Sequence, residues 1–205
     1  PGGIEEDTLV LATGSTTPRK IKDRFADVVN VKDFGAKGDG VTDDTAAIQA
    51  ALDKAKALGV DCVANGGVYL VSNTIKIECG CRFGSAKMVA NCTPESLVEL
   101  VRVGFSNGSA VLKNVFIELP ELSNLSKSVS NPSGWSSVSG TVGVRFCDVS
   151  DSMIHVGRIS NFDTGMLVNG YGKYCAHNTF NLSTLYNNRV NLKIDFTQTA
   201  WVNQN

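Results

Sequence analysis

Residues Met153–Val168 read MIHVGRISNFDTGMLV, and residues Thr179–Ile194 read TFNLSTLYNNRVNLKI. The two stretches align without a gap at a constant offset of 26. Apolar residues match apolar residues, and one asparagine matches another, in the following pairs: Ile154/Phe180, Val156/Leu182, Ile159/Leu185, Asn161/Asn187, Met166/Leu192 and Val168/Ile194. Val144 and Phe146 precede Met166 and Val168 at an offset of 22. The last third of the chain therefore carries an internal repeat.

An offset of 22 to 26, with apolar pairs at i and i+2 between Asn and Gly, is typical of one coil of a parallel β-helix. The apolar residues of each coil would point inward and stack on the next coil, and matched asparagines would form side-chain ladders. Leucine-rich repeats share the period, but their leucine pattern is absent. A β-sandwich is the alternative, although it predicts no constant offset. Further short runs fit the same all-β texture: Val68–Val71, Ile75–Ile77, Leu97–Val103, Val111–Leu119 and Val142–Phe146.

One helix is predicted, over about residues 43–58, and it would cap the N-terminal end of the coil. The strand expected over Val28–Phe34 and the glycine-rich turn Gly35–Gly40 precede it. Thr42 or Asp43 can cap its start, where the helix dipole favours carboxylates, and Gly59 suits its C-terminal end. The spacing of the apolar residues predicts one buried stripe, which consists of Ile48, Ala51, Leu52 and Ala55.

The chain divides into a connector over residues 1–27 and a β-helix domain over residues 28–205. In the connector, Leu9–Leu11 predicts a short strand and Arg19–Asp27 predicts a single helical turn. Residues 119–140 contain eight serines and one tryptophan and interrupt the coil period, which predicts a surface loop between coils. The fold class is therefore all-β: a right-handed parallel β-helix with a single N-terminal capping α-helix.

The balance of charge and apolar residues excludes two classes of partner. The chain has 205 residues with 19 Lys and Arg against 20 Asp and Glu, so its net charge is -1. A nucleic-acid binder would normally show a basic excess. No run approaches the roughly 18 apolar residues of a membrane span. We expect neither nucleic acid nor a membrane as a partner.

Six cysteines lie along the chain, and no cofactor or metal site is predicted from them. Cys79 and Cys81 are closer together than the cysteines of zinc sites, and both histidines are distant. The chain has enough apolar residues to build a core without a disulfide framework. We expect free thiols, mostly buried, in a protein that folds in a reducing cytosol: Cys62, Cys79, Cys81, Cys92, Cys147 and Cys175.

Residues that could act on a glycan are present, but none stands out as catalytic. Hydrolysis usually needs two carboxylates, and a lyase needs a base and a cation. The acids among the coils are usually turn formers: Glu118, Glu121, Asp148, Asp151, Asp163 and Asp195. The cations include Arg145, Arg158 and Lys173. The aspartates of the Gly38–Asp44 turn lack the pattern of a calcium or phosphate loop, so we interpret them as turn and helix-cap residues.

Aromatic side chains suit sugar binding because they present an apolar face to the ring. Trp135 lies in the Ser-rich loop, and Tyr171 and Tyr174 lie in a loop between coils, so these three are the predicted substrate-binding residues. Tyr186 is a further exposed candidate; packing against a neighbouring subunit is the alternative for all four. His155 alternates with the inward Ile154, which predicts an outward imidazole, whereas His177 lies in a turn.

Residues Val28–Ala51, VVNVKDFGAKGDGVTDDTAAIQAA, resemble the opening of the pectate-lyase-like β-helix superfamily. In that group a strand, a Gly-Asp-Gly turn and a helix close the N-terminal end of the coil. Upstream, Ala12–Arg19 (ATGSTTPR) and Asp23–Asp27 (DRFAD) resemble the connector between the particle-binding part and the β-helix of bacteriophage tailspikes. The motifs of this resemblance cover residues 12–60, and the rest of the chain shares only the general texture.

This resemblance implies an N-terminal fragment of a tailspike, which is a homotrimer in the phage virion, assembled in the cytoplasm of the host bacterium. It implies host attachment through a bacterial surface polysaccharide (capsule or lipopolysaccharide), an upstream part that binds the virion or baseplate, and a whole protein that is a polysaccharide depolymerase. Two alternatives remain open: a self-contained carbohydrate-active enzyme of the pectate-lyase-like type, or a structural virion spacer. The glycan, and hydrolase against lyase chemistry, stay undetermined.

Overall fold

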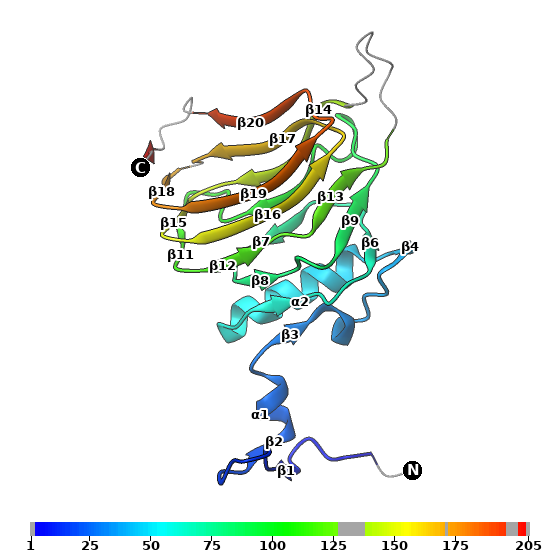
Figure 1. Ribbon diagram of the computed structural model, residues 1–205, viewed down its shortest axis with the longest axis vertical. Coiled ribbons are helices and arrows are strands. Elements are labelled where there is room, and N and C mark those ends of the chain that lie inside the picture. Colours follow the sequence, from blue (N-terminus) through cyan, green and yellow to red (C-terminus); the bar gives the residue numbers. More distant parts are fainter. Residues whose placement is uncertain (1–2, 127–137, 171, 196–200, 204–205) are drawn as a thin grey trace.

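The computed structural model describes residues 3–126, 138–170, 172–195 and 201–203. A small N-terminal unit, drawn in dark blue at the bottom of Figure 1, precedes the coils. It consists of an antiparallel strand pair and one short helix: β1 (Leu9–Val10), β2 (Arg19–Lys20) and α1 (Ile21–Phe25). The strand and the helical turn expected in the connector are therefore both present.

All other strand pairings between the described elements are parallel and build three sheets. The first sheet has ten strands: β3 (Val29–Asn30), β4 (Asp39–Asp43), β5 (Cys62–Val63), β6 (Val68–Leu70), β8 (Cys81–Arg82), β9 (Lys87–Ala90), β12 (Phe116–Glu118), β13 (Glu121–Asn124), β16 (Met153–Ser160) and β19 (Thr179–Tyr186). The second has five: β7 (Ile75–Ile77), β10 (Glu99–Val103), β14 (Val138–Phe146), β17 (Phe162–Asn169) and β20 (Val190–Asp195). The third has four: β11 (Leu112–Lys113), β15 (Val149–Ser150), β18 (Tyr174–Ala176) and β21 (Trp201–Asn203).

The chain visits these sheets in a fixed cycle, so each turn of the chain is one coil. From β10 onward it passes from the five-stranded sheet to the four-stranded sheet, then to the ten-stranded sheet, and returns. Figure 1 shows the resulting stack, with the strands of successive coils running side by side. The predicted parallel β-helix is confirmed.

The coil register agrees with the sequence repeat residue by residue. Met153 pairs with Thr179, and Ser160 pairs with Tyr186, which is the predicted offset of 26. Val144 pairs with Met166, which is the predicted offset of 22. Ile154 and Val156 are buried accordingly, at 0% and 2% exposed, whereas Leu182, which was also expected to point inward, is 42% exposed because no further described strand pairs with β19. Period-2 alternation thus correctly separated the core face from the outer face.

The capping helix α2 (Thr45–Leu58) closes the end of the coil next to the N-terminal unit, as predicted (Figure 1). The predicted stripe is buried, and Gly59 ends the helix in the left-handed conformation, φ 70°. The N-cap residue is Asp44 rather than Thr42 or Asp43. The Asp43 carboxylate still accepts the Thr45 N–H at 3.0 Å, so it does satisfy a donor of the first turn.

The strand expected over Val28–Phe34 is shorter than predicted. Only β3 is extended, and the chain then forms the 3₁₀ helix η1 (Val31–Phe34). Asn30 explains the change, because its side chain accepts the Lys32 N–H at 3.0 Å and so caps the helical turn. A local side-chain hydrogen bond therefore competes with strand extension here.

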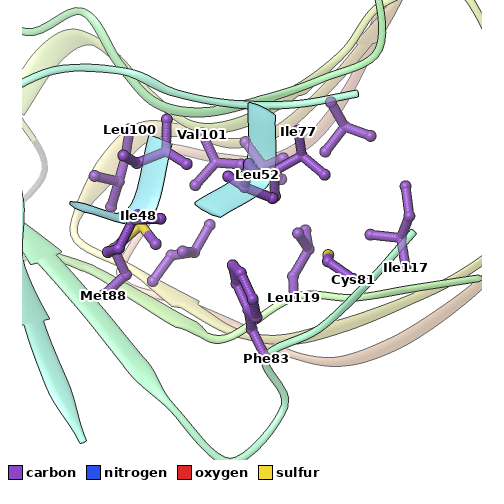
Figure 2. Close-up of a cluster of buried hydrophobic side chains, with 14 of the residues drawn as sticks. Ile48, Leu52, Ile77, Cys81, Phe83, Met88, Leu100, Val101, Ile117 and Leu119 are labelled. Atoms are coloured by element: carbon purple, nitrogen blue, oxygen red, sulfur yellow. The ribbon is translucent and has the colours of Figure 1, made fainter. Parts of the chain in front are cut away.

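The core fills the space between the sheets and beneath α2. In Figure 2, Leu52 of the helix lies beside Ile77 and Val101, Ile48 lies beside Met88, and a second group lies opposite Ile77, Leu100 and Val101. That second group consists of Cys81, Phe83, Met88, Ile117 and Leu119. Each aliphatic or aromatic side chain buried in this way contributes about 1.5–3 kcal/mol to the free energy of unfolding.

The loop predicted over residues 119–140 is not a loop along its whole length. Its first part contains β13, which pairs with β9 and β16 and contributes the buried Leu122 to the core. Its last part contains the start of β14. The serines misled the prediction, because Ser123 lies within β13 and pairs with Ser160. Residues 127–137, at the centre of the segment, lie outside the described residues.

Candidate functional site

A groove of about 290 Å³ lies on the outer face of the ten-stranded sheet. It lies where β12 and β13 are separate strands, whereas β16 passes along both of them without interruption. β19 continues beside β16 in the next coil. The lining residues come from successive coils: Gly84, Glu118, Leu119, His155, Val156, Gly157, Asn181, Leu182 and Ser183.

Three polar side chains of the groove occupy one column across the coils. Glu118 pairs with His155, and His155 pairs with Asn181, in parallel register. Neighbouring strands lie about 4.8 Å apart, so each side chain lies next to the following one. Their neighbours Ile117 and Ile154 are 0% exposed and point into the core, so alternation along each strand directs the polar side chains outward. The outward orientation predicted for His155 is confirmed.

The imidazole of His155 is held from two sides. Its Nε2 lies 3.0 Å from Asn181 Nδ2, and its ring packs edge-on against Phe116 with the centroids 5.1 Å apart. The ring is therefore fixed in orientation at the surface of the groove.

Glycine residues open the space that the polar side chains use. The Glu118 side chain lies over Gly84, because a Cβ on that glycine would come within 2.2 Å of Glu118 Oε1. Gly157 presents no side chain beside His155, in the same coil. A larger residue at position 84 would displace the carboxylate, and a large side chain at position 157 would fill the groove.

A basic side chain extends the column by one coil. Arg82 pairs with Glu118 in register, and its guanidinium lies 5.7 Å from the centroid of the Phe116 ring. Asp61 accepts from Arg82 Nε at 3.1 Å, which anchors the base of the column. A carboxylate, an imidazole, an amide and a guanidinium thus line one strip of the surface. Such a strip offers both donors and acceptors to sugar hydroxyl groups, and a carboxylate–imidazole pair can also transfer protons.

Of the three predicted aromatic sugar-binding residues, the structure describes only Tyr174, and Tyr174 does not line this groove. Trp135 and Tyr171 lie outside the described residues. Tyr174 lies on β18 of the four-stranded sheet, where its hydroxyl accepts from Lys113 Nζ at 2.8 Å and the ammonium lies over its ring. Tyr186 is 51% exposed, with the Arg158 guanidinium 5.3 Å from its ring centroid. The sugar-binding role of these residues stays a prediction.

The candidate acids face cations or backbone donors rather than one another. Asp163 accepts two contacts from Arg189 at 2.5 and 3.1 Å, and these hold the pKa of its carboxyl below the ordinary range. Asp151 lies 3.3 Å from His177. The remaining partners are Lys87 for Glu121, backbone N–H groups for the buried Asp148, and Lys193 for Asp195. The register therefore brings none of the six predicted acids beside another in the described coils.

The aspartates of the glycine-rich turn have structural partners. Asp39 accepts from the N–H groups of Val41 and Thr42, and these hydrogen bonds lower its pKa to about 2. Asp44 is 1% exposed and accepts from the N–H groups of Lys37 and Gly38. Among the residues that the structure describes, no three His, Cys, Asp or Glu side chains are grouped as metal ligands would be. The six cysteines are unpaired and buried, as predicted.

Sequence reasoning named Glu118 and His155 separately but did not bring them together. Glu118 precedes His155 at an offset of 37, whereas the visible repeat has offsets of 22 to 26. The inserted segment between β12 and β16 hides the period. The apolar pair Ile117 and Leu119 gives the signal that was missed, because it matches Ile154 and Val156 at that longer offset.

Comparison with known proteins agrees with the fold and with the sequence resemblance. The family model for rhamnogalacturonase A/epimerase, pectate lyase-like proteins matches residues 28–133. Mannuronan C5-epimerase AlgE1 of Azotobacter vinelandii is 45% identical over 87 residues, which is 42% of this chain and 5% of that protein. The tail spike protein of an Escherichia phage is 36% identical over 90 residues, which is 44% of this chain and 10% of that protein.

Among solved structures, the Dettilon tailspike protein matches with a TM-score of 0.55 and 15% identity. The match covers 78% of this chain and 30% of that one, and it supports the β-helix fold. The chain spans about a tenth or less of the curated relatives described above. No helix in the described part of the chain is long and apolar enough to cross a membrane.

Proposed function

Because this chain belongs to the rhamnogalacturonase A/epimerase, pectate lyase-like family, we propose that it is a polysaccharide-binding segment of a bacteriophage tailspike. Its ligand is a surface polysaccharide of the host bacterium, from the capsule or from lipopolysaccharide, and its role is host attachment. In this proposal the segment belongs to the tail of the virion, is assembled in the host cytoplasm, and follows a part that binds the virion or baseplate. The similarity to a phage tail spike protein supports this assignment.

The groove beside Glu118 and His155 is the observation that carries the proposal. It presents a carboxylate, an imidazole and an amide on three successive coils, and glycines leave room for a ligand above the strands. A glycan that lies across the coils would meet the three side chains in sequence. A purely structural spacer has no need for this open, polar strip.

Binding of bacterial surface glycans to immobilised protein tests the proposal. We expect His155→Ala and Glu118→Gln each to weaken binding about tenfold, which corresponds to one lost hydrogen-bonding group. His177→Ala and Glu95→Gln are matched controls, because His177 lies at another corner and Glu95 is an exposed loop residue. Unchanged binding in both groove variants, with each variant folded, would contradict the assignment.

A depolymerase activity is the second candidate, and the pairing of Glu118 with His155 favours it. Of a carboxyl group and an imidazole one coil apart, one can act as a general acid that protonates the leaving oxygen of a glycosidic bond. The other can act as a general base that removes a proton on the other side of that bond. The products separate the two chemistries, because elimination creates a carbon–carbon double bond, whereas hydrolysis creates none. We expect both Glu118→Gln and His155→Ala to abolish chain shortening if the groove is the cleavage site. Persistent cleavage by either folded variant would place the activity elsewhere.

We further propose that the chain forms a homotrimer through its N-terminal unit. Helix α1 buries no residue, and large apolar side chains of this region are exposed: Ile4, Leu9, Leu11, Phe25 and Val28. A two-stranded sheet is marginally stable in isolation, so contact with further copies would stabilise this unit.

Light scattering on a sizing column measures the assembly state directly. The mass of the monomer is 21.8 kDa, and a trimer has three times that mass. We expect the parent chain at the trimer mass and Phe25→Glu at a lower mass. A parent chain that elutes as a monomer would contradict the trimer proposal and leave the glycan groove to be tested by itself.

A further inference from the structure

An asparagine followed by a glycine occurs three times in the sequence, at Asn65–Gly66, Asn107–Gly108 and Asn169–Gly170. In such a pair the main-chain nitrogen of the glycine can attack the side-chain amide carbon of the asparagine, because glycine has no Cβ to hinder the approach. The attack is intramolecular, which removes the entropic cost of bringing the two groups together. Asparagine is thermolabile for this reason. The surroundings of each pair decide how fast it reacts in the folded chain.

The side chain of Asn107 is prepared for this attack by two donors from Ser109. Its Oδ1 atom accepts the Ser109 N–H at 3.0 Å and the Ser109 hydroxyl at 2.5 Å. Negative charge develops on this oxygen when a nucleophile adds to the amide carbon, and donors at such distances stabilise that charge. Asn107 is exposed and lies in the segment between β10 and β11, so water also reaches the amide.

The attacking nitrogen of Gly108 is not held by a hydrogen bond within the described part of the chain. Its N–H has no acceptor there, whereas the next N–H along the chain, that of Ser109, is bound to Asn107 Oδ1. No strand pairing restrains the main chain between β10 and β11 in the described coils. The nitrogen can therefore approach the amide carbon without breaking a ladder or a turn.

The other two pairs are restrained at the atoms that must move. In the first pair, Gly66 N donates to Ser85 Oγ at 3.0 Å, so the attacking nitrogen is already engaged. In the third pair, Asn169 is the last residue of β17 and pairs with Asp195 of β20. Its Oδ1 accepts from Cys147 Sγ at 3.7 Å. Ring closure would break these contacts, and each lost hydrogen bond raises the barrier.

We propose that Asn107 is a site of spontaneous modification, at which the side-chain amide becomes a carboxylate through a cyclic imide. Gly108 N loses its proton and forms a bond to Asn107 Cγ. The bond from Cγ to the side-chain nitrogen breaks, and this nitrogen takes up a proton and leaves as ammonia. Water then opens the imide. Opening at Cγ gives aspartate, opening at the main-chain carbonyl gives isoaspartate, and both products carry one additional negative charge.

The isoaspartate product changes a corner at which segments from different coils touch. A Cβ on Gly172 would lie 2.8 Å from Gly108 Cα, so the two main chains are in close contact. Isoaspartate adds one carbon atom to the main chain directly before Gly108, which displaces one of the two segments. Gly172 N and Lys173 N donate to the Asp148 carboxylate at 3.2 and 3.1 Å. Displacement of the Gly172 segment weakens these contacts between coils.

Incubation of the folded chain at pH 7 and at pH 9, followed by trypsin digestion and mass spectrometry, tests the proposal. Trypsin releases residues 103–113 as one peptide, in which Asn107 is the only asparagine. We expect Asn107 to react about tenfold faster than Asn65 or Asn169 in the folded chain. The reaction should be faster at pH 9, because the attacking nitrogen must lose its proton. In urea the three pairs should react at similar rates, since the folded surroundings are lost.

Ser109→Ala removes the hydroxyl donor and keeps the N–H, so it should slow the reaction of Asn107 about tenfold in the folded chain. Ser106→Ala is the matched control, because it makes the same change in the same segment, where the Ser106 hydroxyl accepts from Arg102 Nη1 instead. Equal rates at the three pairs in the folded chain would overturn the proposal. Equal rates in the parent, Ser109→Ala and Ser106→Ala would overturn the role of the Ser109 donors.

The effect on the corner is measured by thermal unfolding of the aged parent beside freshly prepared Asn107→Asp. Asn107→Asp carries the additional charge without the additional main-chain atom. We expect the aged chain, which contains isoaspartate, to unfold at a lower temperature than Asn107→Asp. Equal unfolding temperatures would overturn the proposed displacement at Gly172.

Discussion

Single residues at the corners of the coils decide how one coil passes into the next. Asn114, Asp151 and His177 all have positive φ, between 52° and 56°, and they follow the aligned strands β11, β15 and β18. Asn161 and Asn187 repeat the same conformation at another corner, with φ of 71° and 55°. Asn and Asp tolerate the left-handed region better than other non-glycine residues do. The corner composition of the sequence is therefore a backbone requirement.

Asparagine side chains also fasten neighbouring coils to each other. Asn188 is 1% exposed, accepts the Phe162 N–H at 3.0 Å and donates to Ile159 O at 3.0 Å. Asn161 Nδ2 donates to Asn124 O at 3.3 Å across another pair of coils. The predicted side-chain contact between the matched Asn161 and Asn187 is not among the hydrogen bonds of the described coils; the asparagine side chains instead satisfy backbone groups of the neighbouring coil.

The inward register gives a prediction at Val156, which is 2% exposed inside the stack. Val156→Asp should unfold the domain, because a buried charge without a partner costs more than about 4 kcal/mol. Circular dichroism during heating measures this loss. Arg158→Asp is the control, since position 158 is exposed on the same strand. A Val156→Asp chain that melts like the parent would show that the coil register is wrong.

The low pKa of Asp39 predicts a dependence of stability on acid pH. Its folded pKa of about 2 lies below the ordinary value of 3.8, because three donors from Val41 and Thr42 stabilise the ionised form. The unfolded chain therefore binds more protons than the folded chain in this range, and stability falls as the pH falls from about 4 to about 2.

Urea unfolding of the parent and of Asp39→Asn across this range tests the assignment. We expect the parent to be the more stable of the two at pH 6, and the difference to shrink as the pH approaches 2. A difference in the free energy of unfolding that stays constant from pH 6 to pH 2 would mean that the charge of Asp39 does not contribute to stability.

At the scale of elements, α2 and the turn before it form one unit that closes the coil. The Asp44 carboxylate ties Lys37 N and Gly38 N to the start of the helix at 2.7 and 2.9 Å. Gln49 then joins the helix to β7, because its side chain exchanges hydrogen bonds with the N–H and C=O of Lys76. Polar contacts fix the position of the cap, and the buried stripe beneath supplies most of its stability.

Asp44→Ala tests the importance of this connection. We expect a loss of about 2–3 kcal/mol in the free energy of unfolding, because two backbone N–H groups lose a charged, buried acceptor. Chemical denaturation measures the change. Asp33→Ala is the control, since Asp33 is an exposed carboxylate on the neighbouring η1. Equal stability of the two variants would show that the turn does not depend on the Asp44 carboxylate.

The stacked coils enclose one continuous hydrophobic core, and all six cysteine side chains are buried. Burial raises the pKa of Cys62, Cys79 and Cys92 to about 12 and that of Cys147 and Cys175 to about 11. The pKa of the enclosed Cys81 is also raised well above its ordinary value. Such thiols are neutral and unreactive at neutral pH.

A thiol reagent should therefore modify none of the six cysteines in the folded chain and all six after unfolding in urea. The raised folded pKa values also predict that the stability contributed by the protonated thiols is complete below about pH 9 and is lost progressively as the pH rises toward 12, because only the unfolded chain ionises easily there. Rapid labelling of any cysteine at pH 7 in the folded chain would contradict this account.

The sequence by itself was enough to predict the length of the regular coil repeat and which face of a strand points into the core. The repeat of Ile154, Val156 and Ile159 on Phe180, Leu182 and Leu185 is visible in the chain itself, because stacking coils place chemically similar residues at a constant offset. The capping helix was equally readable, since Ile48, Ala51, Leu52 and Ala55 follow the helical period and Gly59 ends it. These features depend on interactions between residues that are near in sequence or related by one fixed spacing.

The tertiary structure alone decided which outward side chains meet. Glu118 and His155 lie side by side because an insertion lengthens one coil to an offset of 37, a spacing that the visible repeat does not show. Arg102 and Arg145 are neighbours, with Glu99 between their charges, for a similar reason. Outward side chains do not pack in the core and need not be apolar. The sequence therefore shows no repeating pattern from which their neighbours on the next coil could be predicted. Only the register between coils of unequal length brings them together.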